Sequence, residues 1–126
     1  MVQMIQTQAQ REKEEQLLFV GDQFRRAIVS YYNTVPSGSA RALPTNLEDL
    51  ISDPRFPTPI QHLRKVYKDP MTGSTEWGLV TQGGGISGVY SQSPKTTFKT
   101  TGFAPVYKAF EGKTTYSDWK FVAKLN

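Results

Sequence analysis

The stretch LLFVGDQFRRAIVSYY, residues 17–32, decides the fold. Its apolar residues recur every three or four positions, which is the period of an α-helix with one buried face. The members of this stripe are Leu17, Val20, Phe24, Ala27, Ile28 and Tyr31. Good helix formers continue upstream to residue 1, and no proline occurs before Pro36. The sequence therefore predicts one helix over residues 1–33 whose second half packs on a core.

Upstream of residue 17 the apolar stripe thins to Val2, Ile5 and Ala9, with Gln and Glu around them. A helix of about 30 residues is roughly 45 Å long, which exceeds the diameter of a small domain. We therefore expect the first half of the helix to project as a stalk. A projecting half-helix has few contacts of its own, so the pattern implies a neighbour, which would be another subunit, a membrane, or both.

The segment after the helix has turn chemistry and one short helical pattern. Pro36 and Gly38 end the first helix, and LPTNLEDLI (43–51) predicts a second, short helix. Thr45 and Glu48 have the spacing of a capping box. The run DPMTG (69–73) is typical of a turn, because proline presets φ and glycine accepts a positive φ.

From residue 76 onward the hydrophobic period changes to two, which predicts strands at 76–80, 86–92 and 119–125. The last strand alternates Trp119, Phe121, Ala123 and Leu125 with Lys120, Val122 and Lys124. Residues 93–117 between them are rich in turns, with room for another short strand. Their expected anchors in the core are Phe98, Phe103, Val106, Tyr107 and Phe110.

The order of long helix, short helix and antiparallel meander predicts an α+β fold. With 126 residues the chain has room for one domain, over residues 1–126. Within it we expect a helical stalk and spine (1–33), a loop with a short helix (34–75) and an antiparallel sheet (76–126). The longest apolar run, residues 17–20, is too short to span a membrane, and the polar start has no signal-peptide pattern.

Composition excludes several kinds of chemistry. The chain has no cysteine, which rules out disulfides, thiolate metal sites and a cysteine nucleophile. Its single histidine, His62, rules out a histidine-cluster metal site, and no G-x-S-x-G motif accompanies it. The segment GGGISG (83–88) matches G-x-G-x-x-G, but strand-like residues follow it, so a glycine hairpin explains it better. We expect no catalytic residues, no cofactor and no metal, although Asp118 with backbone carbonyls would allow a weak calcium site.

The net charge of +4 comes entirely from residues 94–126, which carry six lysines against Glu111 and Asp118. Four of the lysines interleave with aromatic residues: Lys95, Lys99, Lys108 and Lys113 with Phe98, Phe103, Tyr107 and Phe110. This pattern is found in proteins that bind single-stranded nucleic acid. A loop anchored in a core, with its lysines in solvent, produces the same pattern, and we favour this second interpretation.

Several segments resemble the pseudopilins of type II secretion systems, and more widely the type IV pilins. They are REKEEQLLFVGDQFRRAI (11–28), LPTNLEDL (43–50), LRKVYKDPMTG (63–73), EWG (76–78), ISGVYSQS (86–93) and YSDWKF (116–121). Their order over residues 9–125 is nearest the G-type, major pseudopilins. The resemblance implies a pilin-like fold with a long N-terminal helix on a small C-terminal sheet.

Two features depart from that family. Its members begin with a basic leader, a G-F-T-L-x-E processing site and a hydrophobic run of about 20 residues, long enough to span a membrane. None of these is present, so Met1 would be an artificial start that removes the membrane half of the helix. G-type members also share an acidic calcium loop near the C-terminus, where this chain is rich in lysine.

The resemblance implies a structural subunit of a type II secretion pseudopilus, a periplasmic fibre that drives protein export. Its partners would be other pseudopilin subunits and the inner-membrane secretion platform, with the membrane reached through the missing N-terminal helix. The globular domain would lie in the periplasm, and the isolated domain would be monomeric. For assembly we expect exposed residues of the stalk: Gln6, Gln10, Arg11, Lys13, Glu14 and Glu15. A solvated helix with i,i+4 charge pairs would look the same.

Two other functions stay open at this point. The first is a minor pilin of a type IV pilus or DNA-uptake fibre that binds nucleic acid through the basic final third. The second is a small hydrolase, which would need His62 as its base.

Overall fold

The computed structural model describes the backbone of residues 2–125 and the side chains of residues 8–125. The fold is α+β, as predicted. Helix α1 (Val2–Asn33) is followed by the short helix α2 (Glu48–Ile51) and by the strands β1 (Gly78–Gln82), β2 (Gly85–Tyr90) and β3 (Lys120–Val122). The strands form one antiparallel sheet in the order β1-β2-β3. Two 3₁₀ helices, η1 (Pro105–Phe110) and η2 (Tyr116–Asp118), precede β3.

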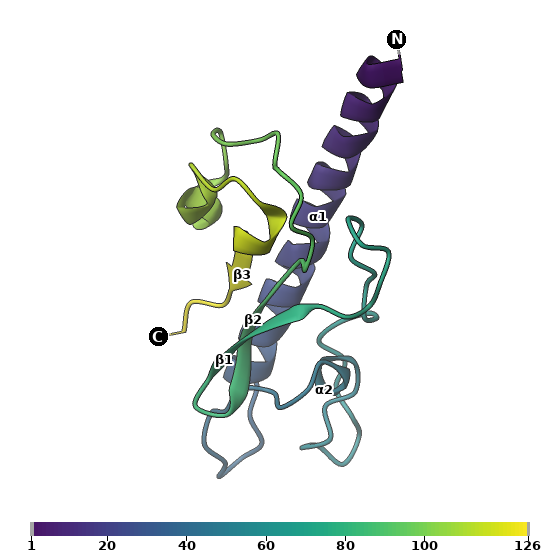
Figure 1. The fold of residues 1–126 in the computed structure, drawn as a ribbon. Coiled ribbons are helices and arrows are strands. Elements are labelled where there is room, and N and C mark those ends of the chain that lie inside the picture. The colour runs from purple at the N-terminus through teal and green to yellow at the C-terminus, as the bar shows by residue number, and fades with distance from the viewer. Residues whose placement is uncertain (1, 126) are drawn as a thin grey trace.

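Helix α1 is the spine of the core. All six residues of the predicted stripe are buried, none of them more than 5% exposed. The helix packs on β2 and β3, while its first turns extend beyond every other element (Figure 1). Gly21 allows this close approach, because a Cβ at that position would lie 2.5 Å from the ring of Phe121 on β3.

The C-terminal end of α1 is closed by a residue from the loop after α2. The last turn of α1 contains no basic residue. Arg55 supplies the missing donor, because its Nη2 donates to the carbonyl oxygens of Tyr31 at 2.8 Å and Thr34 at 2.9 Å. Its guanidinium also lies 3.6 Å from the ring centroid of Tyr31. One carbonyl of the last turn, that of Tyr31, is therefore satisfied by a long-range contact, and the same guanidinium holds the carbonyl of Thr34 directly after the helix.

The sheet follows the expected meander with different strand limits. Gly83 and Gly84 turn between β1 and β2 with φ values of +58° and +85°, which confirms the glycine hairpin. Strand β3 covers three residues instead of the expected seven, although Trp119, Phe121 and Ala123 are buried as the alternation predicts. The turn at 69–73 is confirmed as well. The buried Asp69 carboxylate accepts from the amide of Met71 at 2.8 Å and from Ser91 Oγ at 2.6 Å.

The predicted second helix is wrong in its length and in its cap. It spans Glu48–Ile51 instead of 43–51, because the Pro44 carbonyl accepts from the amide of Ile86 and ties the preceding segment to the sheet. Thr45 does not cap it. The Oδ1 of Asn46 accepts from the amide of Asp49 at 2.9 Å in its place.

The segment 93–117 contains no strand within the part of the chain that the structure describes, only an isolated bridge between Thr96 and Thr115. Two of its five expected anchors are wrong, because Phe98 and Val106 are 43% and 40% exposed. The other three pack in an aromatic cluster that includes Trp119. Its ring stacks on Phe110 with centroids 5.6 Å apart, and Phe103 meets it edge-on at 5.4 Å.

Candidate interaction surface

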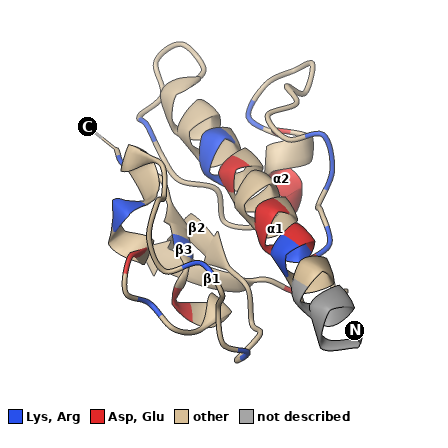
Figure 2. Cartoon of the chain, turned by 90° about the horizontal axis from the view of Figure 1, so that it is seen from above, with Lys and Arg blue, Asp and Glu red and all other residues tan. Residues whose placement is uncertain are grey.

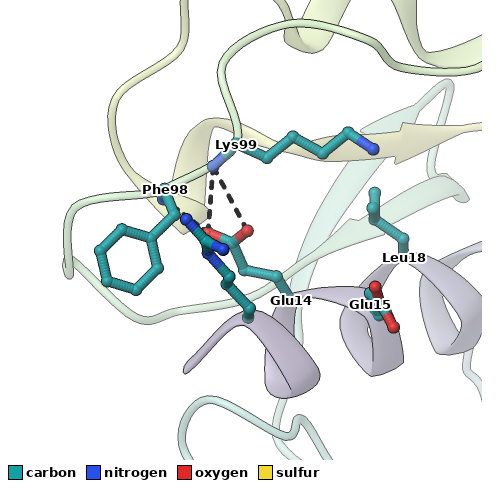
Figure 3. Close-up of a pocket in the computed structure, with 6 residues that line it drawn as sticks. Glu14, Glu15, Leu18, Phe98 and Lys99 are labelled. Atoms are coloured by element: carbon teal, nitrogen blue, oxygen red, sulfur yellow. Dashed lines mark hydrogen bonds between the residues drawn. The ribbon is translucent and has the colours of Figure 1, made fainter. Parts of the chain in front are cut away.

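A buried carboxylate on α1 holds the segment 93–117 in place. Glu14 is 4% exposed, and its Oε2 accepts from the backbone amide of Phe98 at 2.6 Å and from Tyr116 Oη at 2.6 Å. The amide of Lys99 also points at this carboxylate (Figure 3), 3.3 Å from Oε1. Burial and the hydrogen bond to Glu14 raise the pKa of Tyr116, so its hydroxyl stays a donor. Gln10 completes the contact by donating to Tyr116 Oη at 2.8 Å and to the Thr96 carbonyl at 3.0 Å.

A second polar contact lies two turns further along the same face of α1. Tyr107 Oη donates to Asp22 Oδ1, which also pairs with Arg25 Nη2 at 2.9 Å. Arg26 Nε lies 2.8 Å from the other oxygen of Asp22. Burial by itself would raise the pKa of Asp22, but the hydrogen bonds from Tyr107 and Arg25 outweigh burial and lower it. Asp22 is therefore a second charged anchor for the segment before β3.

A groove runs along α1 beside these two anchors. Two cavities of about 250 and 400 Å³ share Leu18 and Lys99 as lining residues, so they lie next to each other along α1, and we refer to the pair as the groove. Lys99 extends its side chain from the loop toward Leu18 (Figure 3). Three exposed apolar side chains line the groove: Phe19, Phe98 and Val106, at 59%, 43% and 40% exposure. Exposed apolar side chains gathered in a groove with a charged rim are typical of an interaction site.

The six residues expected at an assembly interface are not all on the surface. Arg11, Lys13 and Glu15 are exposed, whereas Gln10 is half-buried. The expectation that Glu14 is exposed is wrong, because its carboxylate is fully used by donors of residues 98, 99 and 116. The side chain of Gln6 lies outside the described residues. One feature of the sequence indicates that Glu14 is buried: it lies three residues before Leu17, on the same face of the helix as the buried stripe.

His62 belongs to a buried polar network. Its side chain is 1% exposed, with Nε2 2.9 Å from Asp53 Oδ2 and Nδ1 2.7 Å from Ser30 Oγ. These are the residue types of a hydrolytic triad, but Asp53 is also held by Arg55 at 2.7 Å. A working triad needs a nucleophile open to substrate beside oxyanion donors. Neither cavity of the groove is lined by Ser30 or His62. The network joins α1 to the loop that carries Arg55.

The aromatic residues that interleave with the lysines are largely unavailable for stacking on bases. Tyr107 and Phe110 are buried and Phe103 packs against the core cluster, so Phe98 alone of the four is largely open to solvent. The lysines at positions 95, 108, 113 and 124 are exposed. The structure therefore has the arrangement of a loop anchored in a core, with its lysines in solvent.

The possible weak calcium site gains no further carboxylates. Asp118 Oδ2 accepts from Thr115 Oγ1 at 2.9 Å. Across the part of the chain described, no group of three or more His, Cys, Asp and Glu side chains is placed to hold a metal ion.

No family model, curated protein or solved structure matches this chain. Among the helices described for residues 2–125, none has a segment with the length and hydropathy that crossing a bilayer requires. The fold, the half-packed α1 and the groove beside it are therefore the observations on which a function can rest.

Proposed function

We propose that this chain is a pilin-like structural subunit of a type II secretion pseudopilus. The observation that carries the proposal is the two-part helix α1, which has 32 residues. Its second half is the spine of the core, while its first turns extend beyond the sheet and loops (Figure 1). A subunit that joins a fibre through a bundle of helices needs this division, because one half must hold the globular domain while the other half packs against neighbouring subunits.

The exposed face of α1 next to its projecting turns is consistent with packing against other helices. Arg11, Glu12, Lys13 and Glu15 are exposed on the part of α1 that Gln10 and Glu14 hold against the segment 93–117, and both signs of charge alternate there (Figure 2). Complementary charges of this kind set register and suppress wrong partners more than they add affinity. In this proposal the partners are other pseudopilin subunits and the inner-membrane platform, and the globular domain lies in the periplasm, attached to the membrane through a further N-terminal segment.

The alternative of a pilin that binds DNA has less support. Sequence-independent binding of a single strand combines a basic groove with exposed aromatic faces. Phe103, Tyr107 and Phe110 instead pack in the core cluster. Binding of single-stranded DNA that weakens with salt and falls in a Lys95→Ala/Lys99→Ala/Lys108→Ala variant would favour this alternative over the secretion subunit.

The proposal is tested in the organism that encodes the chain. Deletion of the gene is expected to leave exported proteins in the periplasm at normal levels of synthesis, and the wild-type gene restores export. We expect Glu15→Arg to restore export poorly and Glu76→Arg, at another exposed glutamate outside α1, to restore it fully. Unchanged export in the deletion strain would refute the secretion role.

A second test reads the frame upstream of the codon for Met1. The proposal predicts a basic leader, a G-F-T-L-x-E-like site and about 20 apolar residues that continue into α1, enough to span a bilayer. A folded polar domain encoded at that place would contradict the pilin class.

A further inference from the structure

We propose that the free edge of β3 binds an extended, acidic segment of another protein, which adds a further strand to the sheet. Strand β3 is at one end of the strand order β1-β2-β3, so one of its edges has no neighbouring strand within the described residues (Figure 1). A strand at the edge of a sheet presents unpaired amides and carbonyls to any chain that can lie beside it. A docking strand would bind there whether or not the chain serves in secretion.

The backbone groups of Lys120 and Val122 face away from β2. The amide of Ala123 donates to the carbonyl of Ser87 on β2 at 2.8 Å. Successive residues of an antiparallel strand direct their backbone groups to opposite sides, so those of Lys120 and Val122 point to the open side. No turn or loop in the described part of the chain is hydrogen-bonded to the amides or carbonyls of these two residues. They are therefore available to an added strand.

A cavity of about 360 Å³ lies beside this edge. Its walls come from η1 on one side and from β3 and the residues around β3 on the other. None of the described residues of β2 lines it, so it is on the side of β3 that β2 leaves open. Val106 from η1 and Val122 from β3 contribute exposed apolar side chains to it. The cavity therefore offers room and apolar contact for the side chains of a bound strand.

The charge around the cavity is positive. Three lysines line it, Lys113, Lys120 and Lys124, together with one carboxylate, Asp118. None of the three lysines forms an ion pair with another described residue. The Lys120 ammonium donates to the carbonyl of Ser117 at 3.3 Å, which leaves two of its three donors for a partner. This surface therefore complements an acidic segment.

The side chains of the edge specify the sequence pattern of the partner. Lys120, Val122 and Lys124 are exposed, whereas Phe121 and Ala123 between them are buried. Residues opposite each other on adjacent strands share a face, and opposite charges in such pairs are stabilising. The expected partner therefore alternates an acidic, an apolar and an acidic residue on one face. This pattern is the same in both chain directions, so it fits a parallel or an antiparallel strand.

A second copy of β3 lacks this pattern. Two β3 edges paired antiparallel about Val122 would place Lys120 of one copy opposite Lys124 of the other. Parallel pairing in register would place each lysine opposite its equivalent. Like charges at such positions are destabilising, and lysines on an edge strand commonly prevent association between identical edges. The same lysines favour an acidic strand.

A synthetic peptide with the expected pattern is the direct probe. It has seven residues and capped ends, with glutamate at its second and sixth positions, valine at its fourth and threonine elsewhere. We expect it to bind the full-length protein at low ionic strength, where exposed charges are least screened, and to slow hydrogen exchange in the segment 119–125. A control peptide of the same composition has its glutamates at the second and fifth positions, which lie on opposite faces of a strand. It should bind about tenfold more weakly and leave the exchange unchanged.

A charge exchange at the edge gives a second readout. We expect Lys120→Glu/Lys124→Glu to bind the glutamate peptide about tenfold more weakly, and to bind a peptide with lysine in place of glutamate. The matched control, Lys68→Glu/Lys95→Glu, changes the net charge equally at two exposed lysines that do not line the cavity, and it should bind the glutamate peptide as the wild type does. All four lysines are exposed, so both variants should fold normally.

Four results would overturn the proposal. The first is no binding of the glutamate peptide, and the second is equal binding of the two glutamate peptides, which would mean attraction of charge without an added strand. The third is single-stranded DNA that binds more tightly than the peptide and loses affinity in Lys120→Glu/Lys124→Glu, which would indicate a site for phosphates. The fourth is slow exchange in the segment 119–125 without peptide that depends on protein concentration, which would indicate a contact between copies.

Discussion

The carboxylate of Glu14 joins two parts of the chain that are 84 residues apart in sequence, because it accepts from the amide of Phe98. Glutamine keeps one oxygen but has an NH₂ group in place of the other, so the amide of Phe98 or that of Lys99 loses its acceptor. We expect Glu14→Gln to lower the free energy of unfolding by about 2 kcal/mol, since hydrogen bonds to a charged group contribute about 1.5–3 kcal/mol. Urea denaturation at pH 7 measures the difference.

Glu15 provides the matched control at the next position, because its side chain is exposed. Glu15→Gln should change the free energy of unfolding by less than about 0.5 kcal/mol, as is usual for surface substitutions. Equal effects of the two substitutions would mean that Glu14 does not hold the segment 93–117.

Arg55 is the second residue on which distant elements depend. It pairs with the buried Asp53 and donates to the carbonyls of Tyr31, in the last turn of α1, and of Thr34, directly after it. Arg55→Ala leaves that carboxylate with His62 as its remaining side-chain partner, and breaking a buried pair costs about 3–5 kcal/mol. We expect a loss of that size in the free energy of unfolding, whereas Arg64→Ala, at an exposed arginine, should be nearly neutral. Similar effects of the two would refute the role of Arg55 in closing the helix end.

At the scale of elements, the packing of α1 on β3 depends on the missing side chain of Gly21. Alanine is favoured over glycine within helices by about 1 kcal/mol, so the helix alone would gain from Gly21→Ala. The added Cβ would lie 2.5 Å from the Phe121 ring, and overpacking of this kind typically costs about 1–3 kcal/mol. Because α1 and β3 would have to separate, we expect a net loss of stability, measured as a lower Tm.

Gln16→Ala separates the gain in helix propensity from the cost of overpacking, because Gln16 is on the exposed face of the same helix. It should leave the Tm unchanged or raise it slightly. A rise in Tm for Gly21→Ala as well would show that β3 can move away from α1 without loss.

At the scale of the whole molecule, acid should destabilise the fold through Asp53. Burial alone would raise the pKa of Asp53, but hydrogen bonds from Arg55 and His62 outweigh it and lower the pKa from 3.8 to about 2. A carboxyl whose pKa is lower in the folded state stabilises the fold fully above its unfolded pKa of about 3.9. This stabilisation is lost as the pH falls from about 4 through about 2, and it amounts to about 2 kcal/mol. Denaturation midpoints between pH 5 and pH 2 test the expectation.

Asp53→Asn is the informative variant for this acid dependence. It should be less stable than the wild type at pH 5 and should lose less of its remaining stability by pH 2. Asp118→Asn, at an exposed carboxylate, should keep the acid dependence of the wild type. If Asp53→Asn showed the full acid loss, other carboxyls would be responsible.

Much of this fold could be predicted because the relevant signals are local. The spacing of Leu17, Phe24 and Tyr31 depends only on helix geometry, and all three are buried as expected. The glycine turn at 83–84 and the alternation around Phe121 are likewise properties of a few adjacent residues. The limits of α2 were not predictable in this way, because the contact between Pro44 and Ile86 holds the preceding residues outside the helix.

The candidate site was predictable only in part. Arg11 and Glu15 were expected at an assembly surface and are exposed beside the groove. Phe98 and Val106 were expected in the core, and Phe19 lies outside the predicted buried stripe. That the three line one groove was not predictable, because the sequence does not show which residues face each other across it.

The sequence by itself determined the α+β class, the long helix, its buried face and the antiparallel meander. The hydrophobic periods that distinguish helices from strands depend only on residues close together in the sequence. Only the tertiary structure decided that Glu14 is an internal anchor, that Arg55 closes α1 and that Phe19 lies on a groove with Phe98. Each of these outcomes depends on which distant backbone donors and side chains meet in space. The spacing of residues along the chain does not show which distant residues come into contact.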